Sequence, residues 1–245
     1  MAVTFENFAY SFNNDKGKPV FVPTDRSRRI ADELMPLVKA RAQFEPHYYH
    51  FTKGAHVAAL HAHRTHRYFA RIDLKNFFYS IGRNRVKVAL KEIGVSSAEH
   101  YAKWSTVRNP YEDPRYSLPY GFPQSPLLAT LVLRLSALGT SIANLPTDIL
   151  KSVYLDDIAV SGNDLAALAE AFGTLKAAVA AAHFTLNDDK VREPAEQIDL
   201  FNCDLSYGIS SVTDERVATF YAAEVTDAGT AAFERYREKV AAGNE

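Results

Sequence analysis

The chain has 245 residues, with 28 Lys and Arg against 29 Asp and Glu, and 47% of its residues are hydrophobic. This length and composition suit one large globular domain, or a compact domain with an appendage, and exclude a disordered chain. A single cysteine, Cys203, excludes an internal disulfide framework and a multi-cysteine zinc site. We find no signal-peptide pattern and no apolar run of membrane-spanning length, so we expect a cytoplasmic protein without a membrane partner.

The balanced charge hides an asymmetry between the two halves of the chain. Residues 1–117 carry 19 Lys and Arg against 11 Asp and Glu, whereas the remainder carries 9 against 18. A polyanion such as nucleic acid is therefore expected to meet the front half. The acids that need a metal ion lie in the back half.

The first half of the chain predicts an alternation of strands and helices. Its predicted elements are a strand pair around the turn 13–18, a helix over 28–42, a strand over 68–74, a helix over 84–93 and an irregular stretch over 107–123. Ser125 and Pro126 then predict a helix start, with the Ser hydroxyl as cap and the helix running to about Leu138.

The second half predicts a hairpin, a helix and two further strands. These are a hairpin over 151–161, a helix from Asn163 or Asp164 to about Ala182, and strands over 184–186 and 198–201. The order strand, helix, hairpin, helix, strand is the split βαββαβ pattern. It indicates an α+β fold whose sheet carries two helices on one face.

Two adjacent carboxylates, Asp156 and Asp157, lie between the β-prone runs of the predicted hairpin. An Asp pair in a turn is often only a surface turn. If the strand that ends at Asp73 pairs beside the hairpin, however, three carboxylates share one site. Clustered anions repel unless cations neutralise them, which indicates a two-metal centre for phosphoryl or nucleotidyl transfer. In the metal-free protein, replacing any one of them is expected to leave the stability equal or slightly higher.

Four segments in order resemble the motifs of reverse transcriptases, and most closely those of retron-like, abortive-infection and other defence-associated bacterial members. The four segments are residues 71–81, 118–127, 154–157 and 184–190. The resemblance implies a right-hand polymerase. Its fingers would take residues 1–67 and part of 82–117, its palm 68–205, and a helical tail or rudimentary thumb 206–245.

The resemblance also implies roles for individual residues. Asp73, Asp156 and Asp157 would be catalytic and, with the main-chain carbonyl of Leu74, would hold two Mg²⁺ ions, or Mn²⁺ in their place. The nucleotide site would comprise Lys18 at the triphosphate, Phe78 against the sugar, Lys190 at the pyrophosphate, and Tyr120, Gly121 and Gln124. Alternatives are a solvated turn for Lys18, core packing for Phe78 and a surface salt bridge for Lys190. Arg64, Arg67 and Tyr154 are candidates for nucleic-acid contact, and the histidines near Arg64 are expected to touch phosphate or solvent rather than zinc.

Three features depart from the family pattern. Tyr120 stands where many relatives have Gln, Gln124 stands where a small residue is common, and residues 201–205 lack the glycine of the primer-grip turn. A thumb of three packed helices would need more chain than follows residue 205. We therefore expect low processivity unless a bound RNA, a protein partner or self-association replaces the thumb.

The leading functional hypothesis is an RNA-directed DNA polymerase that uses deoxynucleoside triphosphates. It would copy a dedicated non-coding RNA into DNA in a bacterial antiphage defence or retron-like system. One alternative is untemplated or protein-primed DNA synthesis by the same site. Another is a non-catalytic palm-fold subunit that scaffolds RNA or a second polymerase.

Overall fold

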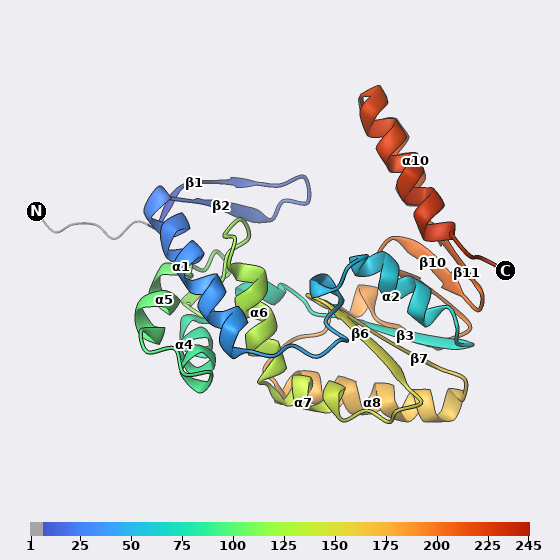
Figure 1. Cartoon of the computed structure of the whole chain (residues 1–245), viewed down its shortest axis with the longest axis horizontal. Coiled ribbons are helices and arrows are strands. Elements are labelled where there is room, and N and C mark those ends of the chain that lie inside the picture. The colour runs from blue at the N-terminus through green and yellow to red at the C-terminus, as the bar shows by residue number, and fades with distance from the viewer. Residues whose placement is uncertain (1–6) are drawn as a thin grey trace, which may run out of the picture. The chain divides into compact units, whose positions relative to one another are not determined.

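The computed structural model describes residues 7–245 (Figure 1). The described residues form two compact units, 7–44 with 75–140 and 45–74 with 141–245. Residues 45–67, predicted to belong to the fingers, pack in the second unit because Tyr48 bridges to Val153 and His63 bonds to two strand serines. The assignment of fingers and palm remains a prediction.

The first unit combines short strands with helices. Its elements are β1 (Phe8–Asn13), β2 (Pro19–Pro23), α1 (Asp25–Arg41), α3 (Phe77–Ser80), α4 (Arg83–Glu92), α5 (Ala98–Trp104), β4 (Val107–Arg108), β5 (Tyr116–Ser117) and α6 (Ser125–Arg134). The predicted strand pair forms because Asn14 Oδ1 accepts from the backbone N–H groups of Lys16 and Lys18 in the turn. Helix α1 begins after Thr24, whose side chain accepts from Ser27 N.

Helix α6 starts differently from its prediction. Gln124 is the N-cap residue, but its side chain makes no capping hydrogen bond. The Ser125 hydroxyl, predicted to be the cap, is buried and has no hydrogen-bond partner. The helix ends at Arg134, and α7 (Ala137–Ala143), which contains the boundary of the units, follows after a break of two residues. In the described chain no single helix is long and apolar enough to cross a membrane; the bent pair of α6 and α7 passes by length and composition only.

The second unit contains the strands, the hairpin and the second helix of the predicted split pattern. Its elements are the single turn η1 (Tyr49–Phe51), α2 (Ala55–His63), β3 (Tyr68–Asp73), β6 (Leu150–Tyr154), β7 (Asp157–Gly162), α8 (Leu165–Ala181), the single turn η2 (Asp188–Lys190), β8 (Arg192–Ala195), β9 (Gln197–Leu200), β10 (Cys203–Ser206), β11 (Ile209–Val212), α9 (Asp214–Ala222) and α10 (Asp227–Ala241). A four-stranded sheet has the order β6-β7-β3-β8. Strand β3, the first of these strands along the chain, therefore lies between the β6–β7 hairpin and β8. Helix α8 begins after Asp164, which accepts from two backbone N–H groups as predicted.

The last strands correct two predictions. Residues 184–186 make only an isolated bridge, Leu186 to Leu74, because the following turn is held on Asp73 beyond the end of β3. The fourth strand of the sheet is β8 instead. Strand β9 does form, but in a separate three-stranded sheet of order β11-β10-β9.

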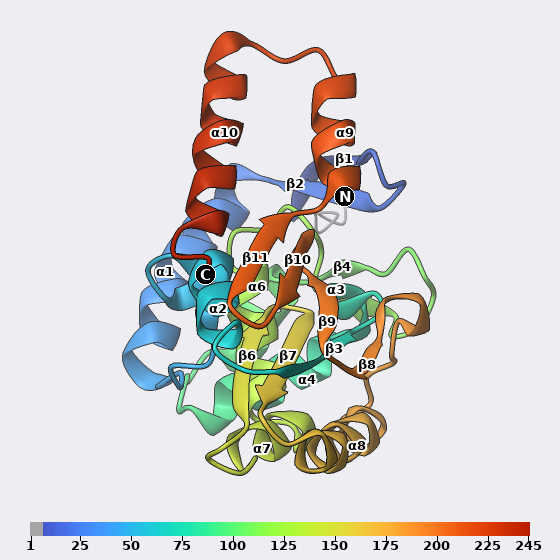
Figure 2. The ribbon, with the colours of Figure 1, turned by 90° about the vertical axis from the view of Figure 1, so that its right-hand side faces the viewer.

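Two helices extend from this second sheet. Figure 2 shows α9 and α10 side by side beyond β10 and β11. The helices separate at residues 223–226 rather than at Gly229, whose N–H bonds to the capping side chain of Thr226 in the first turn of α10. Helix α9 has no buried residue, and α10 buries only Phe233 and Val240, which join the core of the unit with Leu60 and Phe69.

Candidate nucleotidyl-transfer site

Three carboxylates lie at one end of the four-stranded sheet. Strands β3 and β7 are antiparallel, in a register that places Asp73 opposite Asp157. Asp156 lies in the turn of the β6–β7 hairpin, and its carbonyl accepts from the backbone N–H of Leu74 at 3.0 Å. The prediction that the strand ending at Asp73 pairs beside the hairpin is confirmed.

The hairpin turn holds Asp156 in a constrained backbone. Tyr154 and Asp157 form the last pair of the hairpin, so only Leu155 and Asp156 connect the strands. Leu155 has a φ of 58°, a left-handed conformation that costs a non-glycine residue about 1–2 kcal/mol. The paired strands on both sides impose this conformation and so fix the direction of the turn.

The Asp73 carboxylate is almost completely buried, with 2% exposure, and both of its oxygens have partners. Asn187 donates to Oδ1 at 2.7 Å, and the Lys190 ammonium lies 3.1 Å from Oδ2. The backbone N–H of Asn187 also bonds to the Asp73 carbonyl. The segment after α8 therefore closes over Asp73, and the half-exposed Lys190 forms an ion pair with this buried acid.

A buried arginine lies beside the same carboxylates. Arg71 precedes Asp73 by two positions on β3, so both side chains point to one face of the sheet. Its Nε donates to Asp157 Oδ1 at 2.8 Å, and its Nη1 donates to Asp199 Oδ2 at 2.8 Å. Asp199 also receives a hydrogen bond from Arg192. Asp73, Asp157 and Asp199 thus each have a cationic partner.

Burial raises the pKa of Asp157 above its usual range, and the negative charge of Asp73 raises it further. The Arg71 guanidinium opposes both effects. The direction is the one expected for a carboxylate removed from water next to a second carboxylate. A further cation at this position would lower the pKa of Asp157.

Several residues predicted for the nucleotide site come together in the first unit. The Tyr120 ring lies edge-on against Phe78, with centroids 4.8 Å apart, and contacts Tyr79 in the same way at 5.5 Å. The Lys18 ammonium lies 5.5 Å from the centroid of the Tyr120 ring, so its turn is not simply solvated. Phe77, the neighbour of Phe78, is fully buried.

The loop that carries Tyr120 is fixed on strand β2. The N–H of Phe21 bonds to the Tyr120 carbonyl at 2.9 Å. Gly121 has a φ of +97°, and a Cβ there would lie 2.2 Å from the carbonyl oxygen of Phe21, so only glycine fits. The prediction for Gln124 needs correction: its side chain is completely buried and donates to Ser105, which leaves no surface for a nucleotide.

The candidates for nucleic-acid contact separate into three cases. Arg64 donates to the carbonyl of Ala242 at 2.6 Å and to Asn244 at 2.9 Å, and its contact with nucleic acid stays a prediction. Arg67 is exposed and remains a candidate. Tyr154 lines a pocket, described next. Among the nearby histidines, His63 is buried and bonds to two serines rather than to phosphate.

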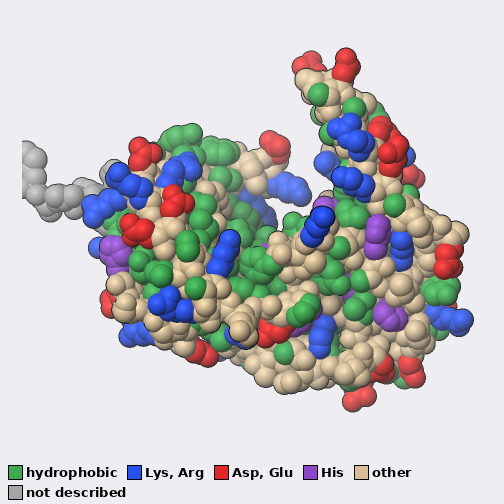
Figure 3. All heavy atoms as spheres, viewed as in Figure 1, with side chains coloured by type: hydrophobic (Ala, Val, Ile, Leu, Met, Phe, Trp, Pro, Cys, Tyr) green, Lys and Arg blue, Asp and Glu red, His purple; other side chains and the backbone are tan. Residues whose placement is uncertain are grey.

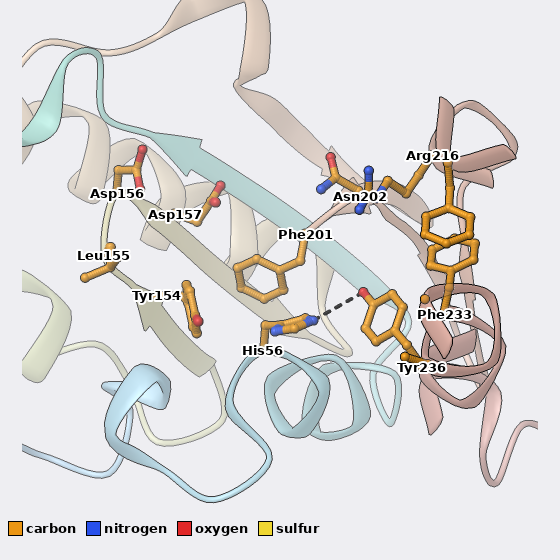
Figure 4. Close-up of a pocket in the computed structure, with 13 residues that line it drawn as sticks. His56, Tyr154, Leu155, Asp156, Asp157, Phe201, Asn202, Arg216, Phe233 and Tyr236 are labelled. Carbon is orange, nitrogen blue, oxygen red and sulfur yellow. Dashed lines mark hydrogen bonds between the residues drawn. The ribbon is translucent and has the colours of Figure 1, made fainter. Parts of the chain in front are cut away.

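A pocket of about 620 Å³ opens beside the hairpin carboxylates (Figure 4). Its lining residues are His56, Tyr154, Leu155, Asp156, Asp157, Phe201, Asn202, Arg216, Phe220, Gly229, Ala232, Phe233 and Tyr236. Phe220 of α9 stacks on Phe233 of α10 with centroids 3.9 Å apart. The turn of Phe201 and Asn202 forms without glycine, since both residues adopt a positive φ, 56° and 58°. The pocket thus joins the hairpin, this turn and the two helices.

Comparison with known proteins decides the family. Residues 13–201 match the family described as reverse transcriptase (RNA-dependent DNA polymerase). The chain belongs to this family. The match covers all four motif segments and the three carboxylates Asp73, Asp156 and Asp157. A search of curated proteins finds no match.

Solved reverse transcriptase and telomerase structures share the fold. A foamy viral protease-reverse transcriptase in complex with double-stranded DNA aligns with a TM-score of 0.53 and 17% identity, over 89% of this chain and 32% of that chain. Telomerase from Candida albicans, in complex with a fragment of telomeric RNA, aligns with a TM-score of 0.56 and 11% identity, over 78% of this chain and 43% of that chain. The chain therefore spans less than half the length of either.

Reverse transcriptases generally use divalent metal ions. Within residues 7–245, no three His, Cys, Asp or Glu side chains are already arranged to hold one. The donor chemistry nevertheless fits, because Asp73 and Asp157 offer hard oxygen ligands side by side and Asp156 lies in the adjoining turn. The positive charge that such a site needs is here supplied by Arg71 and Lys190.

Sequence reasoning missed three residues of the site. Arg71, Asn187 and Asp199 contact the carboxylates or their partners. For Arg71 a signal was present, since an arginine two positions before Asp73 in an otherwise apolar strand must share the face of that acid. Asn187 and Asp199 carried no comparable signal.

Proposed function

We propose that this protein is an RNA-directed DNA polymerase that joins deoxynucleoside triphosphates to a growing DNA strand. The observation that carries the proposal is the register of β3 and β7, which places Asp73 beside Asp157 with Asp156 in the adjoining turn. Membership of the reverse transcriptase family supports it. Nucleotidyl transfer uses carboxylates in this position to hold metal ions, which would offset the negative charge on the attacking oxygen and the leaving phosphate.

In this proposal Asp73, Asp156 and Asp157, with the carbonyl of Leu74, hold two Mg²⁺ ions, or Mn²⁺ in their place. When bound, the ions would make the attacking hydroxyl more acidic and neutralise the departing pyrophosphate. Lys190 lies within ion-pair distance of Asp73. Its side chain is 49% exposed, so it can exchange this partner for a phosphate of the nucleotide.

The nucleotide itself would bind with its sugar at Phe78 and its triphosphate at Lys18. The cluster of Lys18, Tyr120 and Phe78 in the first unit supports this part of the proposal. An aromatic ring at the sugar excludes a 2′-hydroxyl by its bulk and favours deoxynucleotides. Exposed Arg67 and pocket-lining Tyr154 are the proposed nucleic-acid contacts.

The activity is tested by primer extension on an RNA template with labelled deoxynucleotides and Mg²⁺. Wild-type protein should make DNA, and Asp156→Asn should not. Asp148→Asn is the matched control, because Asp148 is an exposed acid of the same unit outside the carboxylate site. A wild-type protein that makes no DNA would contradict the proposal and favour a non-catalytic palm-fold subunit. Equal DNA synthesis by Asp156→Asn and Asp148→Asn would contradict synthesis at the proposed carboxylate site.

The proposal includes a dedicated non-coding RNA as template, within a cytoplasmic antiphage defence or retron-like system. The motif segments resemble those of bacterial members with such roles. Sequencing of the nucleic acid that copurifies with the protein tests this part. Recovery of one RNA species, whose sequence is complementary to the DNA product, is the expected result, and a random set of cellular RNAs would contradict it.

A protein partner or a second copy of the chain is also part of the proposal. Helix α9 buries no residue and α10 buries only two, so the pair offers surfaces with which another molecule can pack. Acidic and basic side chains share the exposed surface of α10 (Figure 3). Light scattering of the purified protein, alone and with coexpressed neighbours, should detect an assembly larger than one chain.

A second candidate is untemplated or protein-primed synthesis by the same carboxylates. It is favoured by Tyr120, whose ring packs on Phe78 where relatives carry an amide, and by the burial of Gln124. Neither side chain then presents an amide for holding the template-paired nucleotide. Sequencing the product tests templating, and loss of attached label after protease digestion tests protein priming.

A further inference from the structure

Six charged side chains form one network of ion pairs beside the carboxylate site. Its members are Asp73, Asp157, Asp199, Arg71, Lys190 and Arg192. Arg71 is the centre, since its guanidinium nitrogens lie 3.7 Å from Asp73, 2.6 Å from Asp157 and 2.8 Å from Asp199. Three acids and three cations balance within the network, before Asp156 adds its own charge.

The geometry of the Arg71 contacts divides the guanidinium into two arms. Nε and Nη2 both reach Asp157 Oδ1, and Nη1 reaches the carboxylate of Asp199. A guanidinium is planar and its donors have fixed directions, so holding two acids at once fixes their separation. The Arg71 side chain is 8% exposed, which leaves little room for another arrangement.

The second arm connects the site to a different sheet. Asp199 lies on β9, and its other oxygen accepts from Arg192 of β8. Strand β9 belongs to the sheet of β10 and β11, from which α9 and α10 extend (Figure 2). Arg71 is therefore the ionic link between the hairpin acid and the sheet that carries the two helices.

Simple stabilisation does not account for such a network. Buried ion pairs often stabilise a fold no better than apolar residues of similar volume, because two charges must leave water. Every residue of β3 from Phe69 to Asp73 is buried. An apolar side chain would therefore suit position 71 as well as its neighbours. The permanent positive charge of Arg71 instead fixes the position of the Asp157 carboxylate and compensates its negative charge.

We propose that Arg71, anchored by Asp199, is a positioning residue that fixes the Asp157 carboxylate beside Asp73 for cation binding and nucleotidyl transfer. This inference rests on the proposed polymerase function. It assigns to Asp199 an effect on the carboxylate site without contact to Asp73, Asp156 or Asp157 themselves. It also makes Asp157 the acid whose direction is set by the protein, through a contact that a lysine cannot reproduce.

The test compares Asp199→Asn and Arg71→Lys with the control Glu193→Gln. Asp199 is 36% exposed, so its variant should fold; Arg71→Lys keeps the charge and loses the two-armed contact. Glu193 pairs with Lys176 at 2.7 Å on the surface of the same unit, and its removal breaks an ion pair outside the network. Three quantities are measured: Mn²⁺ affinity by electron paramagnetic resonance of the free ion, the melting temperature without metal, and kcat and KM for deoxynucleotide.

We expect both network variants to bind Mn²⁺ about tenfold or more weakly and to lose about tenfold or more in kcat, the range found when residues that orient metal ligands are replaced. KM for the nucleotide should stay near that of wild type. Glu193→Gln should match wild type in all three. A merely structural role would lower the melting temperature and leave Mn²⁺ affinity and kcat unchanged, which would overturn the inference.

Three further outcomes are informative. Loss of cooperative melting in Asp199→Asn would also overturn the inference, because Asp199 would then be needed for folding itself. A wild-type protein that neither binds Mn²⁺ nor makes DNA would contradict the proposed function instead. If the wild type binds Mn²⁺ and makes DNA and both network variants do so equally well, only the role of Arg71 and Asp199 is contradicted.

Discussion

The ring of Phe78 meets the ring of Tyr120 edge-on, with 4.8 Å between the centroids and 71° between the planes. Phe78 is 5% exposed, so it is at once a packed residue and the proposed sugar contact. Tyr120 lies between Phe78 and the ammonium of Lys18. The position of Phe78 therefore depends on the ring of Tyr120 as well as on helix α3, to which Phe78 belongs.

Replacing Phe78 with Val should admit ribonucleotides and lower stability at the same time. The smaller side chain opens space for a 2′-hydroxyl. Loss of packing around a buried phenylalanine should cost about 2–4 kcal/mol in the free energy of unfolding. The ratio of dNTP to rNTP incorporation and a urea unfolding curve measure the two effects. Tyr120→Phe, which keeps the ring, is the control, and an unchanged ratio in active Phe78→Val would place the sugar contact elsewhere.

The two hairpin acids should differ in their effect on stability. Both Asp156→Asn and Asp157→Asn should abolish DNA synthesis. Asp157→Asn should also lower the free energy of unfolding by about 1–3 kcal/mol, because it removes the carboxylate that lies closest to the buried Arg71 guanidinium. Asp156→Asn should change it by less than about 0.5 kcal/mol. Thermal melting without metal measures this, and equal melting temperatures for the two variants would contradict the importance of the Arg71 pair.

This pair changes what the sequence suggested about the acids. Clustered carboxylates alone predict that replacing any one of them relieves repulsion. The structure supplies Arg71 and Lys190 as partners, so the repulsion is largely compensated before any metal binds. The hairpin and its pairing with β3 could be predicted because the acids sit between β-prone runs and lie at the end of a strand.

The rest of the site depends on contacts between distant segments. Nothing local to Asp199 shows that β9 joins a second sheet and returns its carboxylate to Arg71. Gln124 likewise looks like any polar loop residue, and its burial against Ser105 is a property of the packed unit. The helix over 165–181 was predictable because Asp164 caps it and its apolar face repeats at helical spacing.

Acid should destabilise the second unit through its buried histidines. Burial lowers the pKa of His63 to about 3 and that of His50 to about 4. The unfolded chain, with an ordinary histidine pKa of 6.5, then binds more protons than the folded chain between these values and pH 6.5. Their contribution to stability is present above pH 6.5 and is lost as the pH falls, by about 2 kcal/mol for each histidine between pH 7 and pH 5.

Urea unfolding at pH 7 and pH 5 measures this loss, and His63→Gln isolates one histidine. The two ring nitrogens of His63 form hydrogen bonds of 2.7 Å each, one with the hydroxyl of Ser152 and one with that of Ser161. A glutamine amide can replace part of this hydrogen bonding without titrating. The variant should be less stable at pH 7 but should lose less stability on acidification. An identical pH dependence in wild type and variant would contradict a neutral, buried His63.

The stacked rings of Phe220 and Phe233 should control how many nucleotides are added per binding event. This contact joins α9 to α10, with the ring planes only 13° apart, and it lines the pocket beside the hairpin acids. Phe220→Ala should loosen the helix pair and shorten the products, while addition of the first nucleotide stays within about twofold because the carboxylates are untouched.

Wild-type binding should itself weaken steeply as salt rises, since phosphate contacts are screened.

A heparin trap on a primed RNA template gives product length per binding event for wild type and variant. Leu165→Ala is the control, because Leu165 is an exposed apolar residue of the same unit on α8, outside the pocket. Its products should match those of wild type. Long products from Phe220→Ala would show that α9 and α10 do not hold the nucleic acid during synthesis. Equal shortening in Leu165→Ala would show that the effect comes from lowered stability of the unit rather than from the helix pair.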